Sequence, residues 1–435
     1  MSPTRRSSKK IMLLKSIKEL PRQRDIKPFN PPSMKDNLSR SRIKNTQDLF
    51  LPILKRVILE QKDKDLPGEV FGLRFDGIDW DYLLFLSLYH RVENLIYTGL
   101  KDCFSELPSI IVMKLKGLWR QSQERNQLEL RVAKEVLADF SNIGFKVIPV
   151  KGLILSQLLY GDINCRSILC DLDVLVLKSS RLEIEEGFKK IGYAVGEDEE
   201  PEGFQWQKDI FRAKDNFCID LHWNLSRHWQ RDAALEEMWK DAHEEYLEGI
   251  PYLSLSLEDT LIYLSVHLAD GDGYRQLIHI CDIARFIHIF KKEINWNKLV
   301  DKARRYNLTS SLYYGLFLPK KILGCPLNDT ILRELKPGIL KRMLVYSFIG
   351  ENNFFVETFI RKFVREYFNF FLFDFIEAKG IKGYLRLMRL MLFMPKKDGK
   401  LSLSQPAKRV MGLFNWTLSE WLKERNKIPL HKVAR

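Results

Sequence analysis

Two aspartates inside an apolar segment constrain the fold of this chain more than any other feature. Residues 171–177 read DLDVLVL, the pattern of a buried strand. Residues two apart on a strand point to the same face, about 7 Å apart along the chain. Two carboxylates on a buried face repel each other and lose hydration, so they need a compensating cation. Asp171 and Asp173 therefore predict a divalent-metal site, for which oxygen ligands and retained waters favour Mg²⁺. A structural turn or a solvated edge strand is the alternative interpretation.

A third carboxylate follows in a second apolar strand. Residues 217–222 read FCIDLH, and Asp220 again has apolar neighbours. If this strand lies beside residues 171–177, three carboxylates converge, which is the arrangement that two-metal phosphoryl transfer requires. Taken alone, Asp220 is equally compatible with a structural role. His222 shares the face of Asp220, so it either contacts substrate or is a satisfied core histidine.

The segment before these strands carries groups that suit a phosphate. Lys151 and Gly152 stand where a predicted strand gives way to a helix. A glycine at such a junction lets backbone N–H groups and the helix N-terminus approach a phosphate. Arg166 precedes the first carboxylate strand and can neutralise phosphate charge. The alternatives are a surface lysine at position 151 and an ion pair of Arg166 with a nearby acid such as Asp162.

These residues stand in a recognisable order. The run VKGLILSQLLYGDINCRSILCDLDVLV, followed by IDLHW, resembles the polymerase-beta-type nucleotidyltransferase superfamily. More closely, it resembles a mostly bacterial, largely uncharacterised branch with K-G, an Arg before D-h-D-h-L-V, and a later D-L-H-W. The resemblance covers roughly residues 140–310. It implies that Asp171, Asp173 and Asp220 bind metal and carry catalysis, and that Lys151, Gly152, Arg166 and His222 contact the nucleotide.

The chain both departs from this pattern and extends it. Leu153 stands where most of the superfamily has Gly or Ser, and Cys170 stands where the branch usually has Gly. In the helical part, His267 and Asp282 match a His and an Asp of the branch, with Arg275 between them. These helical residues either face the cleft or support contacts between helices.

The predicted fold class is α+β, with a small mixed sheet between helical regions. Hydrophobic periodicity is helical up to about residue 144, alternates between short strands and helices, and returns to helix after Trp223. The expected division is a disordered basic tail (1–45), an N-terminal helical region (46–144), the nucleotidyltransferase core (145–225), a helical domain closing the cleft (226–330), and an aromatic-rich helical region with a basic tail (331–435).

Within these regions, individual elements follow from the same patterns. Residues 355–371 carry an aromatic at every fourth position, which indicates a core-facing helix or, with the basic residues after it, a membrane-surface helix. Strands are predicted at 146–150, 171–177 and 192–195, with a hairpin of 210–214 and 217–222. Helices are predicted at 79–92, 108–141, 153–160, 181–191, 257–270, 277–290 and 296–306.

The net charge of +14 is concentrated at the two ends. Residues 1–45 hold 13 Lys/Arg against 3 Asp/Glu and residues 396–435 hold 10 against 3, so residues 46–395 carry −3. Basic ends suit salt-sensitive contact with nucleic acid or anionic lipid, or merely keep the chain in solution. The cysteines lack zinc-site spacing, and no apolar run has the ~18 residues of a membrane span. We expect a cytoplasmic protein.

Together these features predict an enzyme. It transfers a nucleoside monophosphate from an NTP, expected to be ATP, with Mg²⁺ or Mn²⁺ and release of pyrophosphate. The near-neutral middle of the chain favours a small-molecule or protein acceptor over nucleic acid. The first alternative is a catalytically silent nucleotide-binding or scaffolding protein. A second is a peripheral membrane protein anchored by its basic ends, which is compatible with catalysis.

Overall fold

The computed structural model describes most of the chain between residues 40 and 339. The expected disorder up to residue 39 and the aromatic stripe at 355–371 lie outside the described residues, so both remain predictions. The described ranges are 40–60, 75–167, 171–196, 205–214, 217–226, 231–271 and 273–339, with isolated pieces at 341–342, 345, 373, 375–378, 393–395 and 401–403.

The N-terminal part is helical, as predicted. Helix α2 (Arg40–Ile58) begins inside the segment expected to be a disordered tail. Helix α3 (Trp80–Tyr89) begins at the predicted cap, where the Tyr82 N–H donates to Asp79 Oδ1 at 2.9 Å. It ends before the predicted residue 92, because Arg91 adopts a left-handed backbone with φ of 58°. The following elements are α4 (Glu93–Leu100), η3 (Lys101–Cys103) and α5 (Ser109–Asn142).

A mixed sheet forms the middle of the chain and confirms the α+β class. Its strand order is β1-β2-β5-β4-β3. Strand β2 runs parallel to β5, and the other neighbouring pairs are antiparallel. The strands are β1 (Ile148–Pro149), β2 (Asp171–Leu175), β3 (Tyr193–Val195), β4 (Gln207–Arg212) and β5 (Phe217–His222); between them lie α6 (Gly152–Tyr160), η4 (Ile163–Cys165), η5 (Lys178–Ser180) and α7 (Arg181–Lys190).

A hairpin follows where the periodicity after Trp223 predicts only helix, and that prediction is wrong. Strands β6 (His243–Leu247) and β7 (Ile250–Ser254) pair antiparallel across a two-residue turn. The turn residues Glu248 and Gly249 both have positive φ, 47° and 87°, the backbone that a tight hairpin turn requires. The Leu253 N–H donates to the Val147 carbonyl at 2.9 Å, so the two-stranded β6–β7 sheet lies beside the start of β1 without joining the five-stranded sheet.

The remaining described chain is mostly helical. The helix predicted at 257–270 is α-helical only to Val266 and then widens into the π-helix η6 (His267–Gly271). None of the helices within the described ranges is long and apolar enough to cross a lipid bilayer. The elements are α8 (Asp232–Lys240), α9 (Leu257–Val266), α10 (Leu277–Phe290), α11 (Trp296–Tyr306), α12 (Thr309–Leu323), α13 (Asp329–Leu335), and the short strands β8 (Phe393–Pro395) and β9 (Leu401–Leu403).

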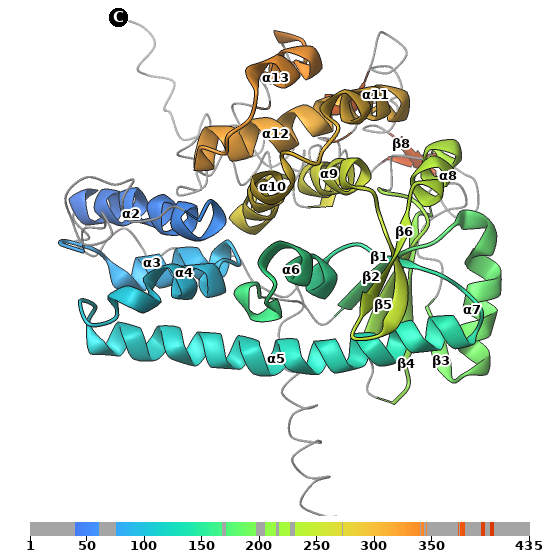
Figure 1. Cartoon of the computed structure of the whole chain (residues 1–435), viewed down its shortest axis with the longest axis horizontal. Coiled ribbons are helices and arrows are strands. Elements are labelled where there is room, and N and C mark those ends of the chain that lie inside the picture. The colour runs from blue at the N-terminus through green and yellow to red at the C-terminus, as the bar shows by residue number, and fades with distance from the viewer. Residues whose placement is uncertain are drawn as a thin grey trace, which may run out of the picture.

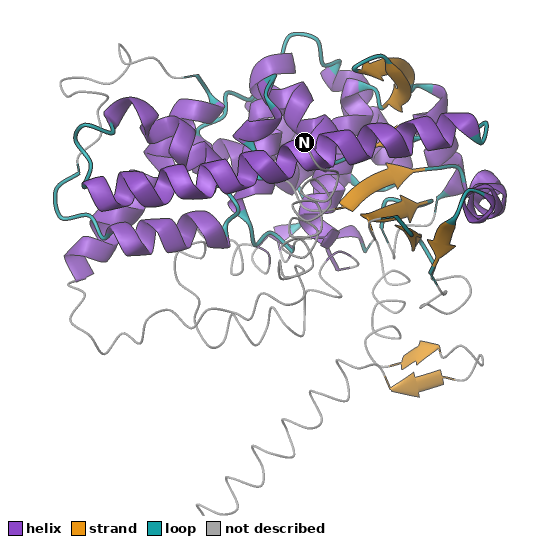
Figure 2. Cartoon of the chain, turned by 90° about the horizontal axis from the view of Figure 1, so that it is seen from below, coloured by secondary structure: helices purple, strands orange, loops and turns teal. Residues whose placement is uncertain are grey.

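Helix α5 joins two hydrophobic cores. Ile111 and Leu115, near its start, belong to a core that α2, α3 and α4 share with α9, α10 and α12. Val136 and Phe140, near its end, belong to a second core under the sheet and α7. In Figures 1 and 2 this long helix runs the length of the molecule, from below α3 and α4 to the sheet. The N-terminal helices are therefore packed against the C-terminal helices, and α5 connects them to the sheet.

Candidate active site

The register of three strands brings carboxylates together. Asp173 of β2 pairs directly with Asp220 of β5, and Asp220 pairs on its other side with Asp209 of β4. Residues directly opposite each other in a sheet share a face, so these three side chains lie on one face. Asp171 lies two residues before Asp173 and is on the same face. The predicted adjacency of the two carboxylate strands is thus present.

Asp173 is held by two donors at one oxygen. Lys151 Nζ lies 2.6 Å and His222 Nε2 lies 3.0 Å from Asp173 Oδ1. Burial alone would raise the pKa of Asp173, but the charge of Lys151 and the hydrogen bond from His222 outweigh it and bring the pKa below its ordinary value. Burial lowers the pKa of His222, so its ring is neutral and Nε2 carries the donated proton.

The pKa values of the other two predicted carboxyl groups are raised instead of lowered. Burial, reinforced by the charge of Asp173, raises the pKa of Asp171 to about 6. Burial, together with the charges of Asp173 and Asp171, raises the pKa of Asp220 to about 8. Close buried carboxylates cannot all be ionised near neutral pH unless a cation lies among them. This electrostatic conflict is what a divalent cation would relieve, so the residues present fit a metal site.

The ligand atoms that lie closest together belong to two overlapping groups. One group is Asp173, Asp220 and His222, and the other is Asp209, Cys218 and Asp220; within each, the atoms lie within 4.8 Å of one another. Asp171 belongs to neither group, so its carboxylate is further from the centre than those of Asp173 and Asp220. Because His222 Nε2 already donates to Asp173, the carboxylates rather than that nitrogen are the natural cation ligands.

The Lys151–Gly152 junction has the backbone that its sequence suggested. Lys151 is the N-cap of α6, and Gly152 is its first residue with φ of 56°, a left-handed value that favours glycine. The Leu153 side chain is only 3% exposed and packs in the core under the sheet. Leu153, which stands where most of the superfamily has Gly or Ser, therefore contributes to the hydrophobic core.

Arg166 is paired with an acid other than the one suggested by sequence. Its Nε donates to Asp282 Oδ2 of α10 at 3.0 Å, and both side chains are buried. Asp162 instead caps η4 through the Asn164 N–H at 2.8 Å. The Arg166 carbonyl accepts from Asn126 Nδ2 of α5 at 2.8 Å, so the backbone of this arginine is held as well.

Two histidines of the helical region lie close to the same site. The rings of His267 in η6 and His279 in α10 are edge-to-face, with centroids 4.7 Å apart. Burial lowers the pKa of both well below 6.5, and the charge of Lys151 lowers them further. The charge of Lys151 thus acts on His267 and His279, and Asp282 pairs with Arg166. Arg275 is exposed, and its charge also acts on His279.

Sequence reasoning missed two charged residues of this region. Asp209 lies on β4 directly opposite Asp220, but the predicted hairpin strand began at residue 210 and so left it out. Extending the alternation of that strand by one residue would have included it. Arg91 lies in the turn between α3 and α4, and its charge lowers the pKa of Asp171. No local sequence signal identifies this arginine, because its position depends on tertiary packing.

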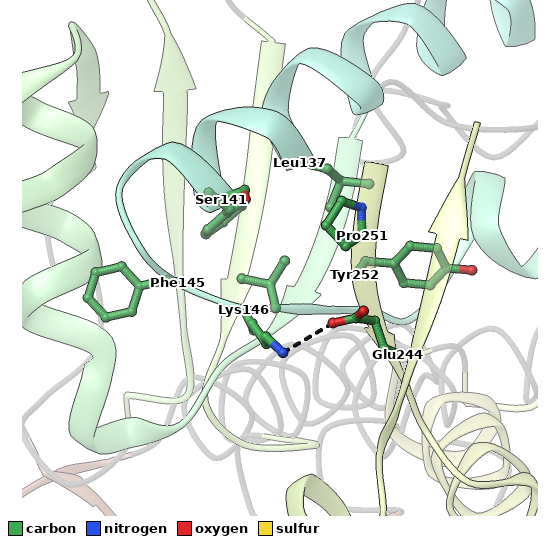
Figure 3. A pocket seen from close by; sticks show the side chains of 9 residues that line it. Leu137, Ser141, Phe145, Lys146, Glu244, Pro251 and Tyr252 are labelled. Atoms are coloured by element: carbon green, nitrogen blue, oxygen red, sulfur yellow. Dashed lines mark hydrogen bonds and ion pairs between the residues drawn. The ribbon is translucent and has the colours of Figure 1, made fainter. Parts of the chain in front are cut away.

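A separate small hollow lies away from the carboxylates. It has a volume of about 60 Å³ and lies between the end of α5 and the β6–β7 hairpin, with Phe145 and Tyr252 in its lining. Lys146 Nζ pairs with Glu244 Oε2 at 3.1 Å beside it (Figure 3). None of the carboxylates of β2, β4 or β5 lines this hollow, so it is not part of the candidate active site.

Comparison with known proteins agrees with this geometry. Residues 76–324 match a family described as uncharacterised nucleotidyltransferases, which covers more than half of the chain. The chain belongs to this family. Searches of curated proteins and of solved structures gave no match. The match confirms the nucleotidyltransferase superfamily and an enzymatic function, and its range extends from the N-terminal helices to the end of α12 in this nucleotidyltransferase.

Proposed function

We propose that this nucleotidyltransferase transfers a nucleoside monophosphate from an NTP, with ATP as the expected donor, to a hydroxyl group and releases pyrophosphate. The observation that carries the proposal is the direct pairing of Asp173 and Asp220 on parallel strands. Without a bound cation, the pKa of Asp173 lies below its ordinary value and that of Asp220 above it.

Asp173, Asp220 and Asp171 are the residues that would hold Mg²⁺ or Mn²⁺. When bound, the cation neutralises the crowded carboxylates and stabilises negative charge on the phosphates. Lys151 and His222 orient Asp173 by donating to its Oδ1. A bound cation would keep Asp220 ionised, and this carboxylate is the group proposed to receive the proton of the acceptor hydroxyl.

The triphosphate is assigned to Lys151, to the N-terminus of α6 and to Arg166. Lys151 uses ammonium protons for Asp173 and for the Tyr263 hydroxyl, which leaves one donor for a phosphate oxygen. The N-terminus of α6 at Gly152 offers backbone N–H groups and a favourable helix dipole. Arg166 adds positive charge from its buried position beside Asp282.

The acceptor is proposed to be a small molecule or a protein side chain. Residues 46–395 carry a net charge of −3, whereas nucleic acid recognition relies on a basic surface. The basic ends of the chain remain available for auxiliary contacts with anionic partners.

The test is pyrophosphate release from each of the four common NTPs in Mg²⁺ or Mn²⁺, with a cell extract as the source of acceptor. We expect release above that of the extract alone, together with transfer of α-³²P label to a product. Asp173→Asn should abolish both signals, whereas Asp232→Asn, a surface aspartate on α8, should leave them unchanged. Binding of Mg²⁺–NTP without any pyrophosphate or labelled product would indicate a catalytically silent nucleotide-binding protein instead.

A further inference from the structure

A partly exposed tryptophan lies beside the histidine that holds the central carboxylate. Trp206 directly precedes β4, and its ring centroid lies 5.1 Å from that of His222, with an angle of 43° between the ring planes. On its other side, His222 Nε2 donates to Asp173 Oδ1 at 3.0 Å. The indole ring is therefore separated from this carboxylate by a single side chain.

Hydrogen bonds hold the backbone at Trp206 in place. The Trp223 N–H donates to the Trp206 carbonyl at 3.0 Å, and the Trp223 indole Nε1 donates to the Gln205 carbonyl at 3.1 Å. The Gln205 side chain accepts in turn from the Arg181 guanidinium of α7 at 3.0 Å. Because the segment before β4 is already ordered, a ligand that covers the Trp206 ring does not have to order this backbone on binding.

Trp223, the other tryptophan of this region, has a different environment. It is 1% exposed, belongs to the core under the sheet, and has the Arg181 guanidinium 4.2 Å over its ring. Its ring is thus covered by the protein itself. Trp206 contacts His222 but remains partly exposed. Because a large aromatic side chain gains free energy when its apolar surface is buried, a flat substrate ring that covers Trp206 would complete its packing.

The strand order β1-β2-β5-β4 separates Trp206 from the groups assigned to the phosphates. Lys151 follows β1 and Trp206 precedes β4, whereas Asp173 and Asp220 lie on the two strands between them. Neighbouring strands lie about 4.8 Å apart, which separates β1 from β4 by roughly 14 Å. In two-metal phosphoryl transfer the reacting phosphorus lies at the cations. With the outer phosphates at Lys151, the sugar and base can extend from that phosphorus toward β4.

We propose that Trp206 stacks on the base of the nucleoside triphosphate. This inference rests on the proposed function, and it adds an aromatic residue to a site whose other assigned contacts are charges and backbone amides. Every nucleobase has a π-face, so stacking on an aromatic side chain strengthens binding without selecting one base. Trp206 therefore provides affinity for nucleoside triphosphates over base-free polyphosphates.

The experiment compares Mg²⁺–ATP with two ligands that lack the base, ribose 5′-triphosphate and inorganic triphosphate in Mg²⁺, by titration calorimetry on the full chain. Trp206→Ala should weaken ATP binding by about tenfold, as expected for one lost base–aromatic stack, and leave the affinity for both base-free ligands unchanged. Trp206→Phe keeps an aromatic ring and should retain most of the ATP affinity. ATP should also quench part of the tryptophan fluorescence of the unaltered protein, and Trp206→Phe should remove that part.

Trp296→Ala is the matched control. This partly exposed tryptophan begins α11, packs against the core of the helical regions and donates through Nε1 to the Lys291 carbonyl; its replacement should leave all three affinities unchanged. Equal weakening of all three ligands by Trp206→Ala would mean that Trp206 only supports His222, and unchanged ATP affinity would mean that no base covers it. Either result overturns the assignment of Trp206 alone. Failure of the unaltered protein to bind any of these ligands in Mg²⁺ overturns the proposed function together with it.

Discussion

The carboxylates of the candidate active site have different surroundings. Asp173 receives hydrogen bonds from an ammonium and an imidazole, whereas the neighbours of Asp220 are other carboxylates and the Cys218 thiol, whose Sγ lies 3.3 Å from its Oδ1. The first carboxylate is therefore ionised and structurally important, and the second is electrostatically strained. Equal substitutions at the two positions should have unequal effects on stability.

Asparagine substitutions separate these two roles. In metal-free buffer at pH 7, Asp173→Asn leaves Lys151 buried without its carboxylate, and we expect the free energy of unfolding to fall by roughly 3 kcal/mol. Asp220→Asn replaces a group that is largely protonated at that pH, so the expected change is below about 1 kcal/mol. Both variants should lose pyrophosphate release by orders of magnitude. Urea unfolding checks the difference, and equal destabilisation would contradict it.

The raised pKa of Asp220 also predicts how stability depends on pH. In the folded protein Asp220 keeps its proton up to a pH of about 8, against an ordinary value of 3.8 in the unfolded chain. At this carboxyl the folded state binds more protons in this window, so its contribution to metal-free stability should fall as pH rises from about 4 to 8. The buried neutral His267 and His279 contribute in the opposite sense below about pH 6.5. Asp171 adds to the fall up to about pH 6.

Melting temperatures in EDTA and in Mg²⁺ or Mn²⁺ test this pH dependence. The cation should reduce the decline, because it compensates the carboxylate charges, and Asp220→Asn should flatten it even in EDTA. A metal-free pH dependence that is the same in Asp220→Asn and in the unaltered protein would show that Asp220 is not in electrostatic conflict with its neighbours.

The three predicted carboxylates could be found from sequence because strand alternation is local. Asp171, Asp173 and Asp220 each have apolar neighbours, so a period of two places them on a buried face without knowledge of the fold. The pairing of Arg166 with Asp282 joins residues 116 positions apart and could not be read in this way. The same holds for Arg91, since nothing in its neighbourhood favours a left-handed arginine.

At the scale of elements, most helices and strands of the core follow from periodicity. Helix α5 lies within one residue of its predicted ends, and β2 and β5 start where predicted. The β6–β7 hairpin was missed because Glu248-Gly249 is not one of the usual turn pairs and β6 is exposed over most of its length. The π-helix η6 was not predictable, because hydrophobic spacing does not distinguish a widened turn from an α-helical one.

The junction between β1 and α6 depends on a single glycine. Gly152→Ala puts a side chain on a residue with φ of 56°, and we expect a loss of about 1–2 kcal/mol in unfolding free energy. Affinity for Mg²⁺–ATP should also fall, since Lys151 and the first amides of α6 would shift. The measurements are urea unfolding and titration calorimetry.

Gly117→Ala is the matched control, because this glycine lies within α5 with open space around its Cα. It should stabilise the protein by about 0.5–1 kcal/mol and leave nucleotide affinity unchanged. Similar effects of the two substitutions would show that the left-handed backbone of Gly152 is not required.

At the scale of the whole molecule, regions that are separate along the chain do not correspond to separate hydrophobic cores. The N-terminal helices and the helices after the sheet were predicted as separate regions, yet they share one core. A single-sequence pattern shows which face of a helix is apolar but not which distant helix covers it. This packing is what brings the α3–α4 turn against the start of α10, where the Ile278 N–H donates to the His90 carbonyl.

A shared core predicts cooperative unfolding. Phe50 of α2 is fully buried in the core that contains α9, α10 and α12, so Phe50→Ala should lower the free energy of unfolding by about 3–5 kcal/mol. The substitution should destabilise the sheet as well, because α5 passes from this core into the core under the sheet. Calorimetry should therefore show one transition that moves to lower temperature as a whole.

The control is Met113→Ala on α5, where the side chain is 62% exposed; this substitution should shift the transition little. Two separated transitions, of which only the earlier responds to Phe50→Ala, would show that the N-terminal helices fold independently of the catalytic core.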